Sequence, residues 1–150
     1  MDRREMLGVL GVGAAGFAAL GTNRAFAAQE KGHKEGHDHL AHQCAEACTD
    51  CLTECNAAFH HCFVQFSGGK KEYANALHLC VDCAEMGNST AALCARSSPL
   101  MGYACDACAR CCDDCAAECE RLKDTEMAGC VEACRKCAKV CREMAKAHGR

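Results

Sequence analysis

Cysteine is the residue type whose number and spacing could do chemistry in this chain. The sequence holds 18 cysteines among 150 residues, a share that indicates either a disulfide scaffold or a metal-binding protein. Within four segments they recur at steps of 3, 4, 7 or 11 residues, which place them on one face of an α-helix. The four stripes are Cys44, Cys48, Cys51, Cys55 and Cys62; Cys80, Cys83 and Cys94; Cys105, Cys108, Cys112, Cys115 and Cys119, with Cys111 beside them; and Cys130, Cys134, Cys137 and Cys141.

These stripes occupy the positions at which a helical bundle normally carries leucine or isoleucine. An isolated buried cysteine is usually an inert small hydrophobe. A seam built wholly of cysteine, however, would leave a cavity where a core should be densely packed. Disulfides are a second interpretation, but cysteines three or four apart on one continuous helix are badly placed for relaxed disulfide geometry. Bound metal explains the pattern best.

The kind of metal follows from ligand chemistry. Zinc sites take four ligands, usually from CxxC pairs in turns, and iron–sulfur clusters favour loops and few ligands per cluster. Copper(I) is soft, prefers thiolate and accepts two or three sulfurs, and each thiolate can bridge to a neighbouring ion. We therefore expect storage of many copper(I) ions per chain, about one ion for every one or two thiols. A metallothionein-like detoxification sink for zinc, cadmium or copper is the alternative.

Four helix-length segments must position these cysteines. Aromatic residues make up only 5% of the chain and proline occurs once, which argues against an all-β fold. Ser98 is a good N-cap for a helix beginning with Pro99, and Asp124 or Thr125 caps the last helix. The expected helices are 40–66, 70–96, 99–122 and 125–146. Since the connections are short, the sequence predicts an all-α, antiparallel up-down-up-down four-helix bundle with a cysteine-lined core.

The two ends of the predicted bundle differ beyond the cysteines. At one end the stripes continue into thioether and imidazole groups, which are weaker and more exchangeable copper ligands. These residues are Met101, Met144, His148 and, if the segment before the bundle is helical, His37. At the opposite end the same faces form an expected apolar plug of Phe59, Phe66, Tyr73, Leu77, Leu122 and Met127. We expect copper to enter at the Met/His end, although Met101 and Met144 could equally be gap-filling core residues.

The N-terminus has the features of a bacterial export signal. Arg3-Arg4 starts a twin-arginine motif, a glycine-rich apolar run follows at 7–20, and Ala25-Phe26-Ala27 provides a small-x-small cleavage site. The apolar run is too short to span a bilayer comfortably; a retained anchor is the alternative. We expect a signal peptide at 1–27, a histidine-rich polar linker at 28–39 and a bundle at 40–148. The mature protein would then reside in the periplasm or another extracytoplasmic compartment, without a membrane span.

Charge and motif content exclude several other functions. The net charge of −3 gives no reason to expect a nucleic-acid partner. The sequence carries no glycine-rich phosphate loop and no constellation of His, Asp and Ser for nucleophilic catalysis. A thiol oxidoreductase would need an exposed, activated CxxC at a helix N-terminus rather than buried repeats. We therefore expect a non-enzymatic protein.

The chain resembles the bacterial four-helix-bundle copper storage proteins over residues 40–144. The most specific segments are CAEACTDCLTEC at 44–55, LCVDCAEM at 79–86, SSPLMGYACDACARCCDDCAAEC at 97–119 and CVEACRKCAKVCREMA at 130–145. The resemblance implies that all 18 cysteines are copper(I) ligands, with Cys111 the least closely placed, and that the protein is a homotetramer. It also implies that exported members supply copper-requiring enzymes, such as membrane methane oxidation systems, directly or through chaperones.

Overall fold

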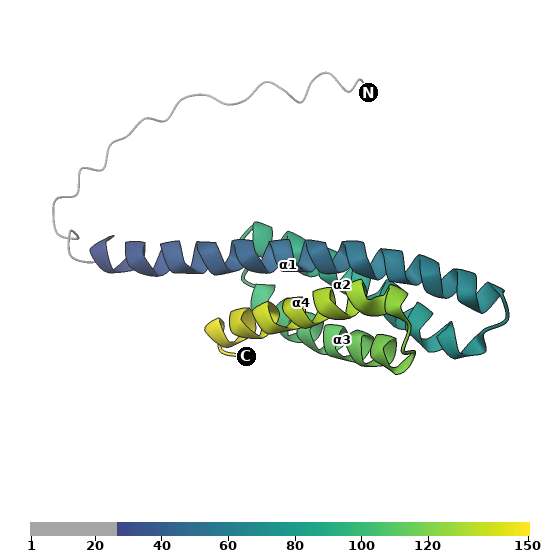
Figure 1. Ribbon diagram of the computed structural model, residues 1–150. Helices are drawn as coiled ribbons and strands as arrows, with labels where there is room; N and C mark the ends of the chain where they lie inside the picture. The colour runs from purple at the N-terminus through teal and green to yellow at the C-terminus, as the bar shows by residue number, and fades with distance from the viewer. Residues whose placement is uncertain (1–26) are drawn as a thin grey trace, which may run out of the picture.

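The computed structural model is an all-helical bundle, as the sequence predicts (Figure 1). It describes the backbone of residues 27–150 and the side chains of residues 39–150. The proposed signal peptide therefore lies outside the described residues, apart from Ala27. The elements in chain order are α1 (Ala27–Ser67), η1 (Lys71–Tyr73), α2 (Ala74–Ala95), α3 (Met101–Arg121), η2 (Thr125–Met127) and α4 (Ala128–Ala147).

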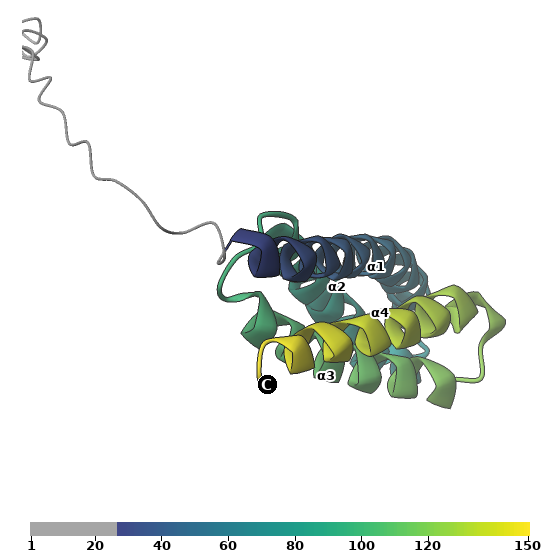
Figure 2. The same ribbon diagram turned by 90° about the vertical axis from the view of Figure 1, so that its left-hand side faces the viewer.

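The four α-helices run up and down in sequence order. The turns that join α1 to α2 and α3 to α4 lie at one end, whereas the α2–α3 connection and the C-terminus lie at the other (Figure 1). Each helix packs against two neighbours, α1 against α2 and α4, and α3 against α2 and α4 (Figure 2). The diagonal pairs, α1 with α3 and α2 with α4, therefore face one another across the core. This arrangement is the antiparallel four-helix bundle that the sequence predicts.

The first residue of each helix differs from the expected one. Helix α1 begins at Ala27, well before Leu40, so the backbone of the expected linker at 28–39 is helical. The segment is rich in Ala, Gln, Glu and Lys, which have high helix propensity. Helix α3 begins at Met101 rather than at Pro99, because Ser98 and Pro99 form a preceding turn in which the Ser98 hydroxyl accepts a hydrogen bond from the Leu100 amide at 3.3 Å.

The start of the last helix matches the expected cap. Asp124 accepts a hydrogen bond from the Glu126 amide at 3.0 Å and so caps a short 3₁₀ turn that leads into α4. A similar turn at 71–73 leads into α2. The α1–α2 and α3–α4 connections are therefore both tight, and this fixes the register of the helices that they join.

The core contains almost nothing but cysteine and alanine. Of the 18 cysteines, 17 are buried, and only Cys111 is partly exposed. The buried alanines lie beside the cysteines on the helix flanks: Ala41, Ala47, Ala58, Ala76, Ala84, Ala109, Ala116, Ala133, Ala138 and Ala145. Because these side chains are small, neighbouring helix backbones approach closely. A Cβ atom at Gly87 would lie only 3.1 Å from the carbonyl oxygen of Cys48, so α1 and α2 nearly touch there.

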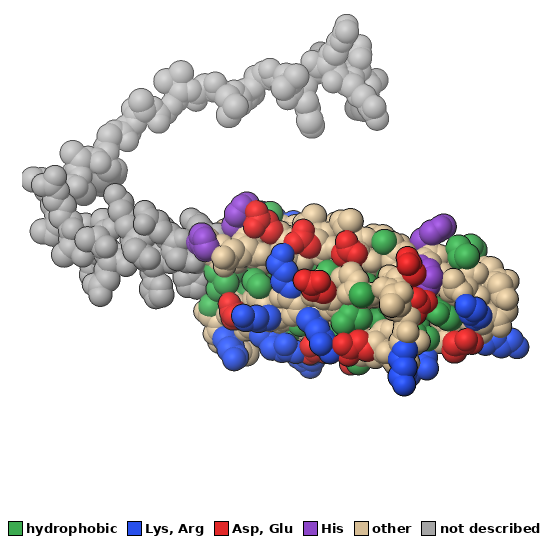
Figure 3. All heavy atoms as spheres, viewed as in Figure 1, with side chains coloured by type: hydrophobic (Ala, Val, Ile, Leu, Met, Phe, Trp, Pro, Cys, Tyr) green, Lys and Arg blue, Asp and Glu red, His purple; other side chains and the backbone are tan. Residues whose placement is uncertain are grey.

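Acidic and basic side chains both lie on the face of the bundle shown in Figure 3. Ion pairs join adjacent helices, including Asp50 with Lys136 at 2.9 Å between α1 and α4, and Glu120 with Arg135 at 2.6 Å between α3 and α4. Such exposed pairs contribute little stability, about 0–1 kcal/mol each. Among the helices that the structure describes, none is long and apolar enough to cross a membrane.

Candidate metal centre

The cysteine sulfurs form one connected row along the bundle axis. Sixteen of them have another cysteine sulfur within 3.5–4.0 Å, and these contacts link all sixteen from one end to the other. At the Met/His end, Cys94 contacts Cys105 at 3.6 Å and Cys105 contacts Cys44 at 3.5 Å. At the opposite end of the bundle, where the α1–α2 and α3–α4 turns lie and which we call the far end, Cys80 contacts Cys119 at 3.8 Å. All 18 cysteines lie in the described part of the chain, and none of them is disulfide bonded.

Several sulfur contacts cross the diagonals of the bundle. Cys51 of α1 lies 3.8 Å from Cys112 of α3, and Cys83 of α2 lies 3.9 Å from Cys134 of α4. Only a side chain as small as cysteine leaves the opposite helices this close across a core. The helical spacing of the sequence and the small flanking alanines together bring the thiols to a common axis.

The row divides into overlapping groups whose sulfurs all lie within 4.8 Å of one another. These groups include Cys48, Cys108, Cys137 and Cys141; Cys51, Cys55, Cys83 and Cys134; Cys55, Cys115, Cys130 and Cys134; Cys80, Cys115, Cys119 and Cys130; and Cys44, Cys105 and Cys141. Among these five groups, five cysteines belong to two groups each, so a thiolate there can bridge two neighbouring ions. Since thiolate is a soft ligand, the row suits a soft cation held by two or three shared sulfurs.

Neighbouring thiols differ in their acidity because they hydrogen bond to one another. The pKa of Cys51 is lowered, first by the hydrogen bond from Cys112 and next by that from Cys134. The pKa of Cys134 is raised, first because its thiol bonds with Cys112. The pKa of Cys83 is lowered to about 7 by hydrogen bonds with Cys111 and then Cys112. A lowered pKa favours the thiolate form, which a metal requires of its cysteine ligands.

Two cysteines stand slightly apart from the row. Cys111 is partly exposed on α3, and the neighbouring Cys83 thiol raises the pKa of Cys111. Cys62 is buried near the far end, and its sulfur lies 3.8 Å from the thioether sulfur of Met127. Sequence reasoning placed Met127 in an apolar plug and missed this sulfur pair, although Met127 stands three residues before Cys130 in the same stripe.

The structure brings the three described residues of the Met/His end together. Met101 and Met144 are buried one turn beyond Cys105 and Cys141, respectively. The Nδ1 atom of His148 donates a hydrogen bond to the carbonyl oxygen of Met144 at 3.0 Å, which assigns the lone pair of the neutral ring to Nε2. His148 packs closely on α3, since a Cβ atom at Gly102 would lie 2.6 Å from the Cβ of His148. The side chain of His37 lies outside the described residues.

The far end is closed by a hydrogen-bond network that the sequence did not reveal. Tyr73 donates from its hydroxyl to the Oδ2 atom of Asp124 at 2.6 Å, and His61 Nε2 lies 2.8 Å from the same oxygen. These bonds lower the pKa of Asp124 to about 2, with the bond from Tyr73 contributing most. The same bond raises the pKa of Tyr73 to about 12. The network ties α1, the α2 hairpin and the start of α4 together.

The expected apolar plug is right for most of its residues and wrong for one. Tyr73 and Met127 are buried, and Phe59, Leu77 and Leu122 pack against the core. Phe66 is 43% exposed, because it lies in the last turn of α1 on the side that faces away from the bundle.

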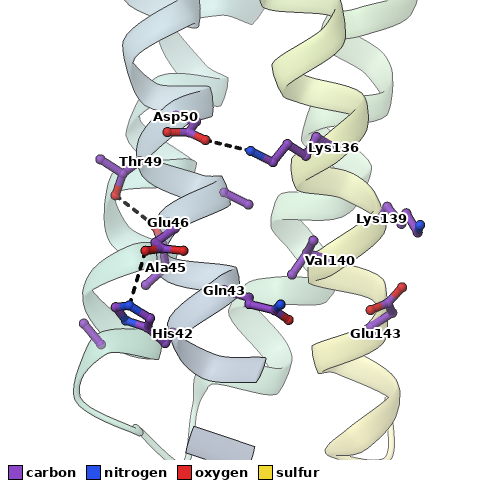
Figure 4. Close-up of a pocket in the computed structure, with 12 residues that line it drawn as sticks. His42, Gln43, Ala45, Glu46, Thr49, Asp50, Lys136, Lys139, Val140 and Glu143 are labelled. Atoms are coloured by element: carbon purple, nitrogen blue, oxygen red, sulfur yellow. Dashed lines mark hydrogen bonds and ion pairs between the residues drawn. The ribbon is translucent and has the colours of Figure 1, made fainter. Parts of the chain in front are cut away.

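A surface groove of about 800 Å³ lies between α1 and α4 but is not part of the metal centre (Figure 4). Its lining carries no cysteine or methionine. His42 pairs with Glu46 at 3.2 Å across one side, and Asp50 pairs with Lys136 at 2.9 Å across the groove. These groups satisfy one another, so the thiols of the core remain the site to which the sequence pattern points.

The comparisons with known proteins agree with this geometry. The family model for copper storage proteins matches residues 37–146, and the chain belongs to that family. Copper storage protein 3 of Bacillus subtilis, in its apo structure, is 33% identical, with a TM-score of 0.60 over 69% of this chain and 96% of that one. None of the curated proteins compared with the chain matches it.

Two metal-bound structures are also similar. The copper(I)-bound form of the Bacillus subtilis protein is 30% identical, with a TM-score of 0.64 over 71% of this chain and 98% of that one. A cytosolic copper storage protein from Streptomyces lividans, described with five coppers, is 25% identical. Its TM-score is 0.68 over 75% of this chain and 97% of that one.

Proposed function

We propose that this protein stores copper(I) reversibly and without catalysis, by binding many ions along its row of buried thiols. The observation that carries the proposal is the unbroken series of sulfur contacts at 3.5–4.0 Å among free thiols. All 18 cysteines are proposed ligands: the sixteen of the row, Cys62 with Met127 beside it, and Cys111 through Cys83. Membership of the copper storage family supports this assignment.

Shared thiols favour copper over zinc as the cargo. A zinc ion with sulfurs at about 2.3 Å needs them about 3.8 Å apart, so the spacing of single groups fits either metal. Three of the four-cysteine groups, those containing Cys48, Cys51 and Cys80, share no ligand with one another. Zinc and cadmium take four ligands per ion and copper(I) takes two or three, so the row can hold more copper(I) ions than zinc or cadmium ions.

An anaerobic titration of the reduced protein with copper(I), against a competing chromophoric chelator, tests the proposal. We expect tight uptake of about ten or more ions per chain, with the thiols becoming unreactive. The same titration with zinc should saturate at fewer ions per chain than the titration with copper(I). Saturation of copper at one or two ions, or zinc displacing copper at equal concentration, would overturn copper storage in favour of the zinc or cadmium sink.

We propose further that copper enters the row through Met101, Met144 and His148, with His37 as an outer ligand. The positions of the two thioethers one turn beyond Cys105 and Cys141 support this route. Such ligands bind copper(I) more weakly than thiolates, so an ion passes inward down a gradient of affinity. Its test is a loading-rate comparison with variants of these residues, given below.

Export and delivery to enzymes are the remaining proposals. The twin-arginine motif at Arg3-Arg4 supports export to the periplasm, where the stored copper would supply copper-requiring enzymes or their chaperones. A fusion of residues 1–40 to a reporter, compared with the Arg3→Lys, Arg4→Lys double variant, tests export. Periplasmic reporter that is lost in the variant is the expected result; cytoplasmic reporter in both would refute it. The proposed homotetramer is tested by light scattering.

A further inference from the structure

The core face of α2 departs from the other helices at two positions. Six of its seven buried residues step by 4, 3, 4, 3 and 4 along one stripe, with Ala84 beside them: Ala76, Cys80, Cys83, Gly87, Thr90 and Cys94. Between Cys83 and Cys94, therefore, two consecutive positions of the stripe carry no sulfur. Gly87 has a steric reason, because a Cβ atom there would lie 3.1 Å from the carbonyl oxygen of Cys48. No steric reason excludes a cysteine at position 90, since a cysteine is smaller than a threonine.

Thr90 is unusual for a second reason. It is 0% exposed and is the one buried polar side chain among the described residues. Its hydroxyl oxygen has no hydrogen-bond partner within the protein. A buried hydroxyl without a partner destabilises a fold, and threonine in a helix usually bonds to a carbonyl one turn back. The unpartnered donor therefore indicates a partner that the apo protein does not supply.

Contacts on both sides of Thr90 fix its level along the row. Between α2 and α3, Cys83 contacts Cys112 and Cys94 contacts Cys105, each at 3.6 Å. Since α2 and α3 run in opposite directions, Thr90 lies at the level of Cys108. By the same reasoning on α1, where Cys51 contacts Cys83 at 3.8 Å, Thr90 lies at the level of Cys44.

The level of Thr90 has thiols from α1, α3 and α4, and the nearest α2 thiol toward the Met/His end is Cys94, one turn away, which contacts Cys105 at 3.6 Å. The group of Cys48, Cys108, Cys137 and Cys141 draws on α1, α3 and α4, and the group of Cys44, Cys105 and Cys141 draws on the same three helices. A copper(I) ion held by two thiolates carries a net charge of −1, which is unfavourable in a buried, weakly polar core. A hydrogen-bond donor on α2, the fourth helix around this level, would stabilise that charge.

We propose that the Thr90 hydroxyl donates a hydrogen bond to a copper-bound thiolate at this level, Cys44 or Cys108. Thr90 is then a positioning residue that favours the loaded form of the row, and this inference rests on the proposed binding of copper by the buried thiols. In the apo protein the hydroxyl destabilises the fold slightly; on loading it gains its partner. A threonine at position 90 thus makes the apo protein slightly less stable and the copper-loaded protein more stable.

The test compares Thr90→Val, which keeps the shape and removes the donor, with Thr90→Ser, which keeps the donor. Thr49→Val is the matched control, because the exposed Thr49 hydroxyl bonds to the Ala45 carbonyl on the surface of α1. We measure the melting temperature of each apo protein, copper(I) retention against a chelator, and the luminescence of the copper–thiolate centres. Thr90→Ala provides a second variant without the donor should Thr90→Val not fold.

We expect apo Thr90→Val to melt at or above the wild-type temperature and to lose a subset of its ions about tenfold more readily. Thr90→Ser and Thr49→Val should retain copper as the wild type does. Equal retention by Thr90→Val and wild type would overturn the role of the hydroxyl, as would a lower melting temperature of apo Thr90→Val. A wild type that does not bind copper(I) would instead refute the proposed function, and the two failures are distinct.

Discussion

The two ends of the bundle are built on different principles. At the far end, Tyr73 and His61 both contact Asp124, and directional hydrogen bonds tie three elements together. At the Met/His end, Met101 and Met144 contribute flexible thioethers. One end is braced by groups that bind protein, and the other presents groups that also bind copper(I). The difference shows how a bundle can exchange metal at one end while the other keeps the helices in register.

Copper loading should change the two ends unequally, and this is the largest expected effect. Filling the row is expected to raise the melting temperature by at least about 10 °C, because each ion crosslinks helices in the folded state only. Hydrogen exchange should slow most near Met101 and Met144, at the end of the bundle opposite the Asp124 network. Exchange that slows equally at Tyr73 and at Met101 would contradict the contrast between the ends.

Removing the two thioethers should slow copper uptake without reducing capacity. The double variant Met101→Leu, Met144→Leu keeps the packing volume and is expected to load about tenfold more slowly from a copper(I)–chelator complex. The matched control is Met127→Leu, which removes the thioether beside Cys62 at the far end. Stopped-flow absorbance measures the rates. Equal slowing by Met127→Leu would mean that copper reaches the row from both ends.

Breaking the far-end network should lower stability and leave the loading rate unchanged. Tyr73→Phe or Asp124→Asn is expected to lower the free energy of unfolding of the apo protein by about 1–3 kcal/mol, as for other hydrogen bonds to a charged group. Urea denaturation measures the loss. A variant with unchanged stability but slower loading would assign the network to copper uptake rather than to bracing.

The same network predicts a pH dependence. Asp124 has a folded pKa lowered from 3.8 to about 2, so its contribution is present above pH 3.8 and is lost as the pH falls through about 2. Tyr73 has a folded pKa raised from 10.0 to about 12, so its contribution is present below pH 10.0 and is lost as the pH rises through about 12. In Asp124→Asn both dependences should disappear from denaturation curves measured across these ranges.

The smallest expected effect concerns the packing of His148. In Gly102→Ala the new methyl group would overlap the Cβ of His148, so the C-terminal turn must move outward. We expect loading to slow by about twofold to threefold, as for the weakening of one outer ligand. Gly68→Ala is the control at the opposite end, where the added methyl would make an ordinary contact at 3.4 Å. Identical rates for the two variants would remove His148 from the uptake route.

Much of the fold and of the thiol site could be predicted because both depend on periodicity. Steps of three and four residues place cysteines on one helical face, and short connections make sequential helices antiparallel neighbours. The cap at Asp124 was also readable, since it depends on one local side chain. The predicted cap at Ser98 was wrong, because Ser98 lies in the turn before α3 and Leu100 occupies the N-cap position. The start of α1 was missed because the polar segment before Leu40 carries no hydrophobic pattern and signals helix only through propensity.

The features that escaped prediction are set by contacts between helices. The bond between Tyr73 and Asp124 joins residues 51 positions apart, and nothing in the local sequence of either indicates the other. The pairing of Cys62 with Met127 depends on helix register. The spacing of Cys83 and Cys94 places Thr90 on the buried face of α2, but only the packing shows that its hydroxyl has no hydrogen-bond partner. Sequence periodicity predicts which face is buried, whereas packing decides which atoms meet.

The single connected row of sulfurs has a consequence for the order in which cargo moves. If ions enter and leave only through the Met/His end, ions near Cys80 and Cys119 cannot leave before the ions that lie between them and that end. The protein then behaves as a stack, in which the last ion added is the first removed. A pulse of one copper isotope followed by a second isotope should therefore be released in reverse order, with the first pulse retained as a deep reserve.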